Sequence, residues 1–226
     1  MKSNPTIAGL AMDMVQSGMA LGLGGGSTIA GIIPALADEI KNGLSLELFT
    51  SSDATKTRIR DAGLYVHDQG HAKKLDIYFD GCDQFDQNLN ALKSGGGIHT
   101  HEKILASMAD QFVIVADEKK QVEFFEKKFP LVIDLLPESR DYIPPRIESH
   151  FPGSVTKFRE QNGQWALTSN GNLLLEIWFE SWPALSGINA WLKTLPGLIE
   201  SSLFYSMASS AIVGSQDGAR LIVRTG

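Results

Sequence analysis

Residues 19–40 read MALGLGGGSTIAGIIPALADEI, a stretch in which three kinds of pattern follow one another. A short apolar run, Met19 to Leu23, leads into the glycine turn Gly24-Gly25-Gly26-Ser27-Thr28, and residues 29–40 carry apolar side chains at helical spacing. The order predicts strand, turn and helix. Backbone N–H groups at such a turn can cradle a phosphate, although the same glycines also suit a plain tight turn. The turn has neither the lysine of a P-loop nor the glycine spacing of a dinucleotide site.

The alternation of strands and helices continues through the first half of the chain. Largely apolar segments predict further strands at residues 46–49, 75–79 and 112–115, and helical spacing predicts helices at residues 6–17, 54–62 and 102–108. Ser51-Ser52-Asp53 offers N-caps for one of these helices. Such alternation predicts an α/β fold with a Rossmann-like, mostly parallel sheet flanked by helices. Functional groups are then expected where strands end, as at Asp80 and Asp117.

The sequence pattern changes after about residue 127. Prolines become frequent, Asn170-Gly171 predicts a hairpin turn between two apolar segments, and residues 183–195 are amphipathic. We therefore expect residues 127–203 to form a smaller inserted α+β domain of ferredoxin-like type. Residues 1–126 and 204–226 would form the main α/β domain, in which the tail returns to the sheet as a strand pair turning at residues 215–218.

Composition excludes several protein classes. The 226 residues are 43% hydrophobic, enough for one substantial core, and no apolar segment approaches the roughly 20 residues that span a bilayer. The chain opens without a signal-peptide pattern, so a cytoplasmic location is expected. Its only cysteine, Cys82, excludes an internal disulfide. A net charge of -6 with scattered basic residues argues against nucleic-acid binding.

A short window concentrates acids, bases and glycines. Asp80-Gly81-Cys82-Asp83 precedes Lys93-Ser94-Gly95-Gly96-Gly97 and Glu102-Lys103. The two aspartates suit magnesium, proton transfer on a sugar, or a structural turn. Lys93 favours sugar chemistry, because an ammonium can stabilise a developing oxyanion. Glu102 can act as a general base or simply complement a helix dipole.

A metal site is the less favoured interpretation of the nearby histidines. His99 and His101 alternate along the chain, which suits one metal only in an extended segment, and no further ligand cluster is evident. No metal is therefore expected.

Together, these segments resemble type A ribose-5-phosphate isomerases in order and spacing. The resemblance rests on Gly24 to Thr28, Ser51 to Thr55, Asp76 to Asp83, Lys93 to Gly97, Glu102-Lys103, Ala116 to Gln121, Phe129 to Leu131, Asn170 to Asn172 and Asp217-Gly218. It covers nearly the whole chain.

The resemblance implies an isomerase that interconverts ribose 5-phosphate and ribulose 5-phosphate through an enediolate, without a cofactor and as a homodimer. Glu102 would move the proton between C1 and C2, Asp80 would assist ring opening, Asp83 would orient hydroxyls and Lys93 would stabilise the enediolate oxygen. The implied substrate-binding residues are Gly24, Gly25, Gly26, Ser27, Thr28, Ser52, Thr55, Gly95, Gly96 and Lys120.

The chain departs from the family pattern near these residues. Cys82 and Gln84 stand where the family usually has Ala and Glu, Gly25 replaces a usual Thr, and Ser94 replaces a glycine. His99 and His101 fall in a stretch where the family usually has small and apolar residues followed by Arg. A catalytically weak sugar-phosphate sensor, or another sugar-phosphate enzyme or CoA transferase of the same superfamily, is the alternative.

Overall fold

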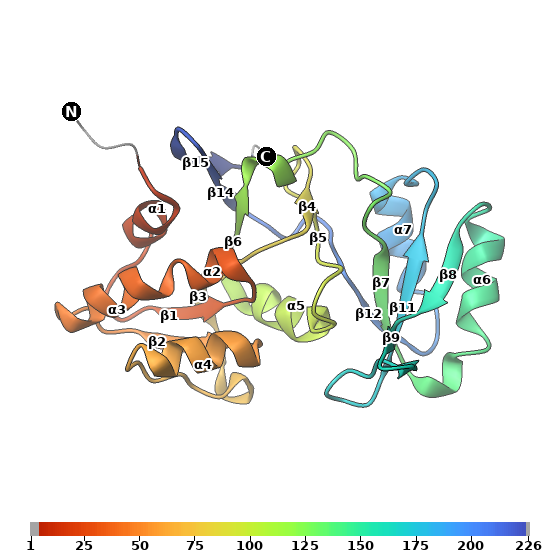
Figure 1. Ribbon diagram of the computed structural model, residues 1–226, viewed down its shortest axis with the longest axis horizontal. Helices are drawn as coiled ribbons and strands as arrows, with labels where there is room; N and C mark the ends of the chain where they lie inside the picture. Colours follow the sequence, from red (N-terminus) through yellow and green to blue (C-terminus); the bar gives the residue numbers. More distant parts are fainter. Residues whose placement is uncertain (1–4, 225–226) are drawn as a thin grey trace. The chain divides into compact units, whose positions relative to one another are not determined.

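The computed structural model describes residues 5–224, and the chain forms two units, each built from segments far apart in the sequence (Figure 1). The first unit comprises the chain up to Cys82, His101–Gln121 and the chain from Ser206. The second comprises Asp83–Thr100 and Val122–Tyr205.

The expected parallel sheet is present in the first unit. Its six strands lie in the order β15-β14-β6-β3-β1-β2, and every neighbouring pair is parallel except the terminal hairpin of β14 and β15. This confirms both the mostly parallel sheet and the returning tail. The strands are β1 (Ala20–Leu23), β2 (Glu47–Thr50), β3 (Leu75–Asp80), β6 (Ala109–Asp117), β14 (Ser210–Ser215) and β15 (Gly218–Val223).

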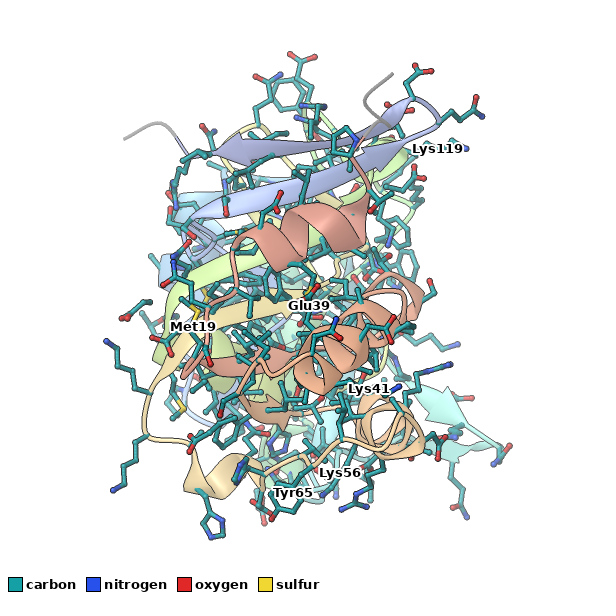
Figure 2. The ribbon with its side chains drawn as sticks, turned by 90° about the vertical axis from the view of Figure 1, so that its left-hand side faces the viewer. Met19, Glu39, Lys41, Lys56, Tyr65 and Lys119 are labelled. Carbon is teal, nitrogen blue, oxygen red and sulfur yellow. The ribbon has the colours of Figure 1, made fainter. Side chains whose placement is uncertain are left out.

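Helices accompany this sheet, and two begin at residues whose side chains cap them. Thr6 Oγ1 accepts a hydrogen bond from Gly9 N at 3.0 Å, and Ser52 Oγ accepts one from Thr55 N at 3.3 Å. Figure 2 shows α1 and α3 in front of the strands. The helices are α1 (Ile7–Asp13), α2 (Ser27–Ala30), α3 (Ile33–Lys41), α4 (Asp53–Asp61) and α5 (His99–Met108), with the short turns η1 (Gln69–His71) and η2 (Glu118–Lys120).

The helix expected over residues 29–40 was wrong as a single element. The structure has two helices there, α2 and α3, separated at Gly31 and Ile32. Pro34 lies in the first turn of α3, where its missing N–H does no harm. In the interior of one long helix it would have removed a hydrogen bond, and apolar periodicity alone did not reveal this break.

Alternate residues of the central strands form the core of the first unit. Leu21, Ile77 and Val113 are fully buried, as is Ile59 of α4. Because side chains alternate along a strand, these strand residues point to one face of the sheet. On that face they pack against the helices. The core therefore holds the strands rigidly beneath the loops that follow them.

The second unit contains an antiparallel four-stranded sheet in the order β12-β7-β11-β8. Along the chain its elements alternate β-α-β-β-α-β, which is the ferredoxin-like arrangement expected. Buried apolar side chains of α6 and α7 pack with those of β7 and β11 in one core. The elements are β7 (Leu131–Leu135), α6 (Ile143–His150), β8 (Val155–Phe158), β11 (Leu173–Trp178), α7 (Leu185–Leu192) and β12 (Leu198–Ser201).

Smaller pieces complete this unit. The turn expected at Asn170-Gly171 is confirmed: Gly171 has φ +80°, and its N–H donates to Thr168 O at 2.9 Å. The second unit also has a three-stranded sheet, a small hairpin and a short turn, which are β13 (Leu203–Phe204), β5 (Ala91–Leu92) and β4 (Gln84–Phe85), then β9 (Glu160–Gln161) with β10 (Gln164–Trp165), and η3 (Pro137–Ser139). Between residues 5 and 224, no helix is long and apolar enough to cross a membrane.

Candidate active site

Four neighbouring strands of the first unit end beside the loops that sequence analysis singled out. β1 leads into Gly24, β2 leads into the cap of α4, β3 ends at Asp80, and β6 leads into η2, which contains Lys120. The carboxyl ends of parallel strands share one edge of a sheet, so these loops line that edge. The fold thus collects at one place residues that are up to about a hundred positions apart.

Asp80 is held in one orientation by three donors. It is fully buried, and its Oδ1 accepts hydrogen bonds from Gly25 N at 3.1 Å and Gly81 N at 2.7 Å. Its Oδ2 accepts a hydrogen bond from the phenol of Tyr78 at 2.7 Å. A buried carboxylate must be hydrogen-bonded to be tolerated, and these donors provide that. Asp80 is therefore preorganised.

Gly24 and Gly25 face this carboxylate and Glu102 at very different distances. A Cβ at Gly24 would lie 1.9 Å from Asp80 Cγ, so only glycine lets the loop pass so closely. A Cβ at Gly25 would lie 3.6 Å from Ser52 Oγ and 3.8 Å from Glu102 Oε1, which is ordinary contact. Glu102 thus reaches the glycine turn.

Glu102 belongs to the first turn of α5 and is 6% exposed. Its charge also reaches Tyr78, whose phenol is fully buried. Burial raises the pKa of Tyr78 well above its usual value of 10.0, and the charges of Asp80 and Glu102 raise this pKa further. The phenol therefore stays protonated and donates to Asp80, close to a second carboxylate.

Ser52 and Thr55 are buried, and their hydroxyls take part in the local framework. Thr55 Oγ1 donates to Gly24 O at 2.7 Å, and Ser52 Oγ caps α4. Thr55 therefore holds the glycine turn in place. Ser27 and Thr28 follow Gly26, which has φ +93°, and begin α2.

Lys120 completes the group in the first unit. Its Nζ donates to Cys82 O at 2.6 Å, just beyond Asp80 in the chain. Asp117 caps η2 by accepting a hydrogen bond from Lys119 N at 2.9 Å, which fixes the start of the turn that carries Lys120. The described part of the first unit therefore brings together the glycine turn, Ser52, Thr55, Asp80, Glu102 and Lys120.

The other expected residues belong to the second unit, where they form an ordered loop. Asp83 Oδ2 accepts hydrogen bonds from Ser94 N at 2.5 Å and Gly95 N at 3.2 Å. Lys93 is 8% exposed, its N–H donates to Ser202 O, and its Nζ lies 5.8 Å from the centre of the Phe204 ring. Asp83 is thus the residue that orders the loop beginning at Lys93.

The glycines of this loop are required by the backbone. Gly96 and Gly97 have φ values of +57° and +69°. A Cβ at Gly97 would lie 2.5 Å from Leu174 Cδ1. The loop therefore packs closely on β11.

Two departures from the family pattern have local structural roles. Ser94 Oγ donates to Pro130 O at 2.5 Å. The amide of Gln84 donates to Glu126 O at 3.3 Å and accepts from Glu126 N at 3.0 Å, a two-way pairing that a carboxylate cannot make.

The two histidines make other contacts. His99 is buried with Nε2 3.3 Å from Glu200 O, and the backbone oxygen of His101 accepts a hydrogen bond from Gln69 Nε2 at 3.0 Å. Within residues 5–224, no cluster of three or more His, Cys, Asp or Glu side chains is arranged to hold a metal.

Sequence analysis missed two residues that support these groups. Tyr78 donates to Asp80, and Arg159 Nη2 donates to Ser94 O at 2.6 Å while its Nε binds Glu176 at 2.9 Å. Tyr78 had a detectable signal, because a phenol two residues before an acid on one buried strand shares its face. Arg159 lies 65 residues from Ser94 and had none.

Comparisons with known proteins agree on one family. The family model "Ribose 5-phosphate isomerase A (phosphoriboisomerase A)" matches residues 48–218. Ribose-5-phosphate isomerase A 1 of Oceanobacillus iheyensis is 37% identical, over 92% of both chains, and ribose-5-phosphate isomerase A of a Synechococcus species is 30% identical, over 96% of this chain and 95% of the relative. A solved D-ribose-5-phosphate isomerase in complex with phospho-erythronic acid matches with a TM-score of 0.88 at 28% identity, over 96% of both chains.

Proposed function

The chain belongs to the ribose 5-phosphate isomerase A family and is an aldose–ketose isomerase that converts D-ribose 5-phosphate to D-ribulose 5-phosphate, and we propose that it works through an enediolate with Glu102 as the base. The observation that most supports this mechanism is the pair of buried carboxylates, Asp80 and Glu102, held around one glycine turn. A water-poor setting strengthens electrostatic interactions with reacting atoms.

The proton transfers follow from the chemistry of an aldose. Glu102 removes the proton from C2 of the open sugar, the C1 carbonyl oxygen gains the electron pair, and an enediolate forms. Protonated Glu102 then returns the proton to C1, while the proton of the O2 hydroxyl moves to O1, which leaves a ketone at C2 and a hydroxyl at C1. Proton transfer by a positioned side chain typically contributes 10²–10⁴-fold, roughly, to the rate.

Asp80 is proposed to open the sugar ring by accepting the proton of the C1 hydroxyl and passing it to the departing ring oxygen. Its hydrogen bonds from Gly25, Gly81 and Tyr78 support this role, because they fix the orientation of the carboxylate. The glycine turn that packs on it keeps its orientation.

Lys93 is proposed to stabilise the negative oxygen of the enediolate. Its burial supports this role, because a partly desolvated ammonium interacts more strongly with an oxyanion than a hydrated one. Asp83 is proposed to orient sugar hydroxyls. It would also order the loop, because its carboxylate accepts hydrogen bonds from the N–H groups of Ser94 and Gly95.

Substrate binding is assigned to the remaining residues. We propose that the turn Gly24–Thr28, Ser52, Lys120, Gly95 and Gly96 contact the sugar phosphate, and that Thr55 acts through Gly24. Assembly as a homodimer, a cytoplasmic location and independence from added cofactors are parts of the same proposal. A light-scattering mass of twice the 24.6 kDa chain would support the homodimer.

The test follows carbon-bound protons. Ribulose 5-phosphate formation and deuterium uptake from D₂O are measured without added metal for wild type, Glu102→Gln and the exposed control Glu39→Gln. We expect turnover and uptake in wild type and in the control. Both should fall by about 10²-fold or more in Glu102→Gln, with ribose 5-phosphate still bound. Equal uptake in Glu102→Gln would contradict the assignment, and bound substrate without either signal in wild type would favour a sensor.

A further inference from the structure

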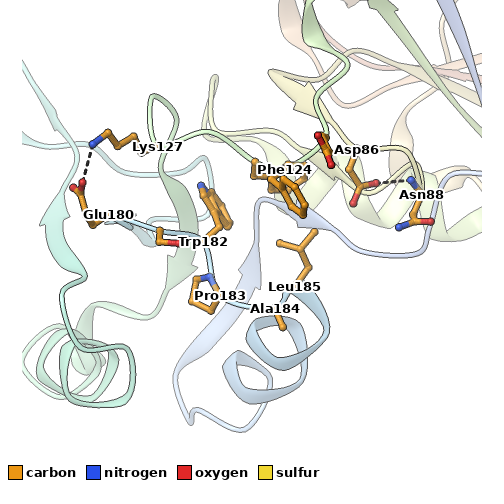
Figure 3. Close-up of a pocket in the computed structure, with 12 residues that line it drawn as sticks. Asp86, Asn88, Phe124, Lys127, Glu180, Trp182, Pro183, Ala184 and Leu185 are labelled. Atoms are coloured by element: carbon orange, nitrogen blue, oxygen red, sulfur yellow. Dashed lines mark hydrogen bonds and ion pairs between the residues drawn. The ribbon is translucent and has the colours of Figure 1, made fainter.

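The second unit contains a cavity of about 530 Å³ built by residues that the isomerase mechanism does not use (Figure 3). Three segments line it: the turn between β4 and β5, residues 123–127, and residues 180–185, which lead from β11 into the first residue of α7. Its size falls within the range of small-molecule sites, roughly 300–1,000 Å³.

Hydrogen bonds hold the three segments together. Val122 N donates to Phe85 O at 2.9 Å, and the backbone of Glu126 pairs with the Gln84 amide. Trp182 Nε1 donates to Glu126 O at 3.2 Å. The cavity is therefore preformed, which lowers the entropy lost when a ligand binds.

Aromatic side chains form much of the wall. The Trp182 ring meets Phe125 edge to face, with ring centres 5.2 Å apart at 84°. Phe124, by contrast, is 76% exposed beside the cavity. Figure 3 shows both Phe124 and Trp182 on this wall. A fixed indole and an uncovered phenyl ring offer flat apolar surfaces to a planar ligand.

The charged side chains give the cavity a negative excess. Lys127 forms an ion pair with Glu180 at 2.8 Å, so these two opposite charges balance. The other two carboxylates that line the cavity belong to Asp86 and Glu123. Asp86 is 8% exposed and accepts hydrogen bonds from Asn88 N, Asn90 N and Asn90 Nδ2, all of them neutral donors. Its negative charge is thus held at the wall without being neutralised by these donors. A phosphate or other polyanion would be repelled there.

We propose that this cavity is a second ligand site, separate from the isomerase site, that binds a small organic cation in which an ammonium, guanidinium or amidinium group is joined to a planar apolar body. The planar body lies against Phe124 and Trp182, and the cationic group faces the carboxylates. Cations are attracted both to aromatic faces and to partly buried carboxylates.

The test uses three molecules of nearly equal shape and different charge. Benzamidine, benzamide and benzoate are titrated into the full-length protein by calorimetry, with saturating ribose 5-phosphate present so that the substrate site is occupied. We expect benzamidine to bind with a Kd of order 1 mM or below, at least about tenfold tighter than benzamide, and benzoate not to bind. Added salt should weaken the binding of benzamidine, because it screens the attraction between the cation and the carboxylates.

Exposed variants locate the binding. Phe124→Ala should weaken the binding of benzamidine roughly three- to tenfold, and Glu123→Gln should weaken this binding as well. Tyr65→Ala removes an equally exposed ring of the first unit and should leave the binding unchanged. Isomerase turnover in each variant verifies folding. Absence of benzamidine binding, equal binding of benzamide, competition by ribose 5-phosphate, or an equal effect of Tyr65→Ala would each overturn the proposal.

Discussion

Substituting alanine at Gly24 should disable the carboxylate of Asp80, whereas the same change at Gly25 should leave that carboxylate in place. The new Cβ at residue 24 would lie 1.9 Å from Asp80 Cγ and Oδ1 and 2.5 Å from Oδ2, while ordinary contact begins at 3.4 Å. The shortfall is therefore 1.5 Å at the closest atoms. Gly24 N also donates to Phe79 O at 2.8 Å, so the backbone is tied to β3 and the side chain of Asp80 has to move instead.

The distance that the Asp80 side chain has to move determines how much stability and activity should be lost. The three hydrogen bonds of Asp80 are 2.7–3.1 Å long, and a shift of this size takes at least two beyond hydrogen-bond distance. Each bond to a charged acceptor contributes roughly 1.5–3 kcal/mol, so the free energy of unfolding should fall by about 3 kcal/mol or more. We expect kcat/KM to fall at least about 100-fold, which corresponds to ~2.7 kcal/mol.

Gly25→Ala is the matched control. Its Cβ would meet Ser52 Oγ at 3.6 Å and Glu102 Oε1 at 3.8 Å, with no close contact, so stability should change by less than about 1 kcal/mol. Turnover is measured by ketose formation, and unfolding by circular dichroism. Tryptophan fluorescence is unsuitable here because all four tryptophans lie in the second unit. Wild-type kcat/KM in Gly24→Ala, or equal losses in both variants, would refute the packing argument.

Three further outcomes are expected. Tyr78→Phe removes the 2.7 Å bond to Asp80 and should lower the free energy of unfolding by about 1.5–3 kcal/mol at pH 7, measured by urea unfolding; an unchanged value would show that the bond contributes nothing. Because the pKa of Tyr78 is raised in the folded state, the stability it contributes is complete below its usual pKa of 10.0 and declines above it, so the difference between wild type and Tyr78→Phe should shrink as the pH rises above about 10; a constant difference would argue against the shift. Thr55→Val leaves Gly24 O without its 2.7 Å donor and should cost about 1–3 kcal/mol of stability, whereas Thr57→Val, at an exposed bond, should stay within about 1 kcal/mol.

The amino-acid pattern was sufficient to predict the parallel sheet and its loops. Buried strand segments such as Phe112–Val115 are continuous apolar runs, and the N-cap of α4 at Ser52 depends on a hydrogen bond between residues three apart. The turn at Gly171 likewise depends on its own φ of +80°. Such features are encoded locally, so they can be recognised in a single segment.

Prolines and very short strands were harder to interpret. Pro34 and the pair Pro144-Pro145 lie in the first turns of α3 and α6, positions that tolerate proline but that apolar spacing does not distinguish from a break. β5 and β13 have two residues each, and Leu92 pairs with Leu203, more than a hundred residues away. Two residues are too few to establish a period.

Local pattern in the chain therefore established the class of fold, the strand ends that bear Gly24 and Asp80, and the acids and bases on which a family resemblance rests. Tertiary packing established how those groups are held. The approach of Gly24 to a carboxylate 56 positions away and the hydrogen bond from Arg159 to the Ser94 carbonyl both join atoms across the folded chain. Local propensity acts over a few residues, whereas these contacts exist only once the strands have found their order and register.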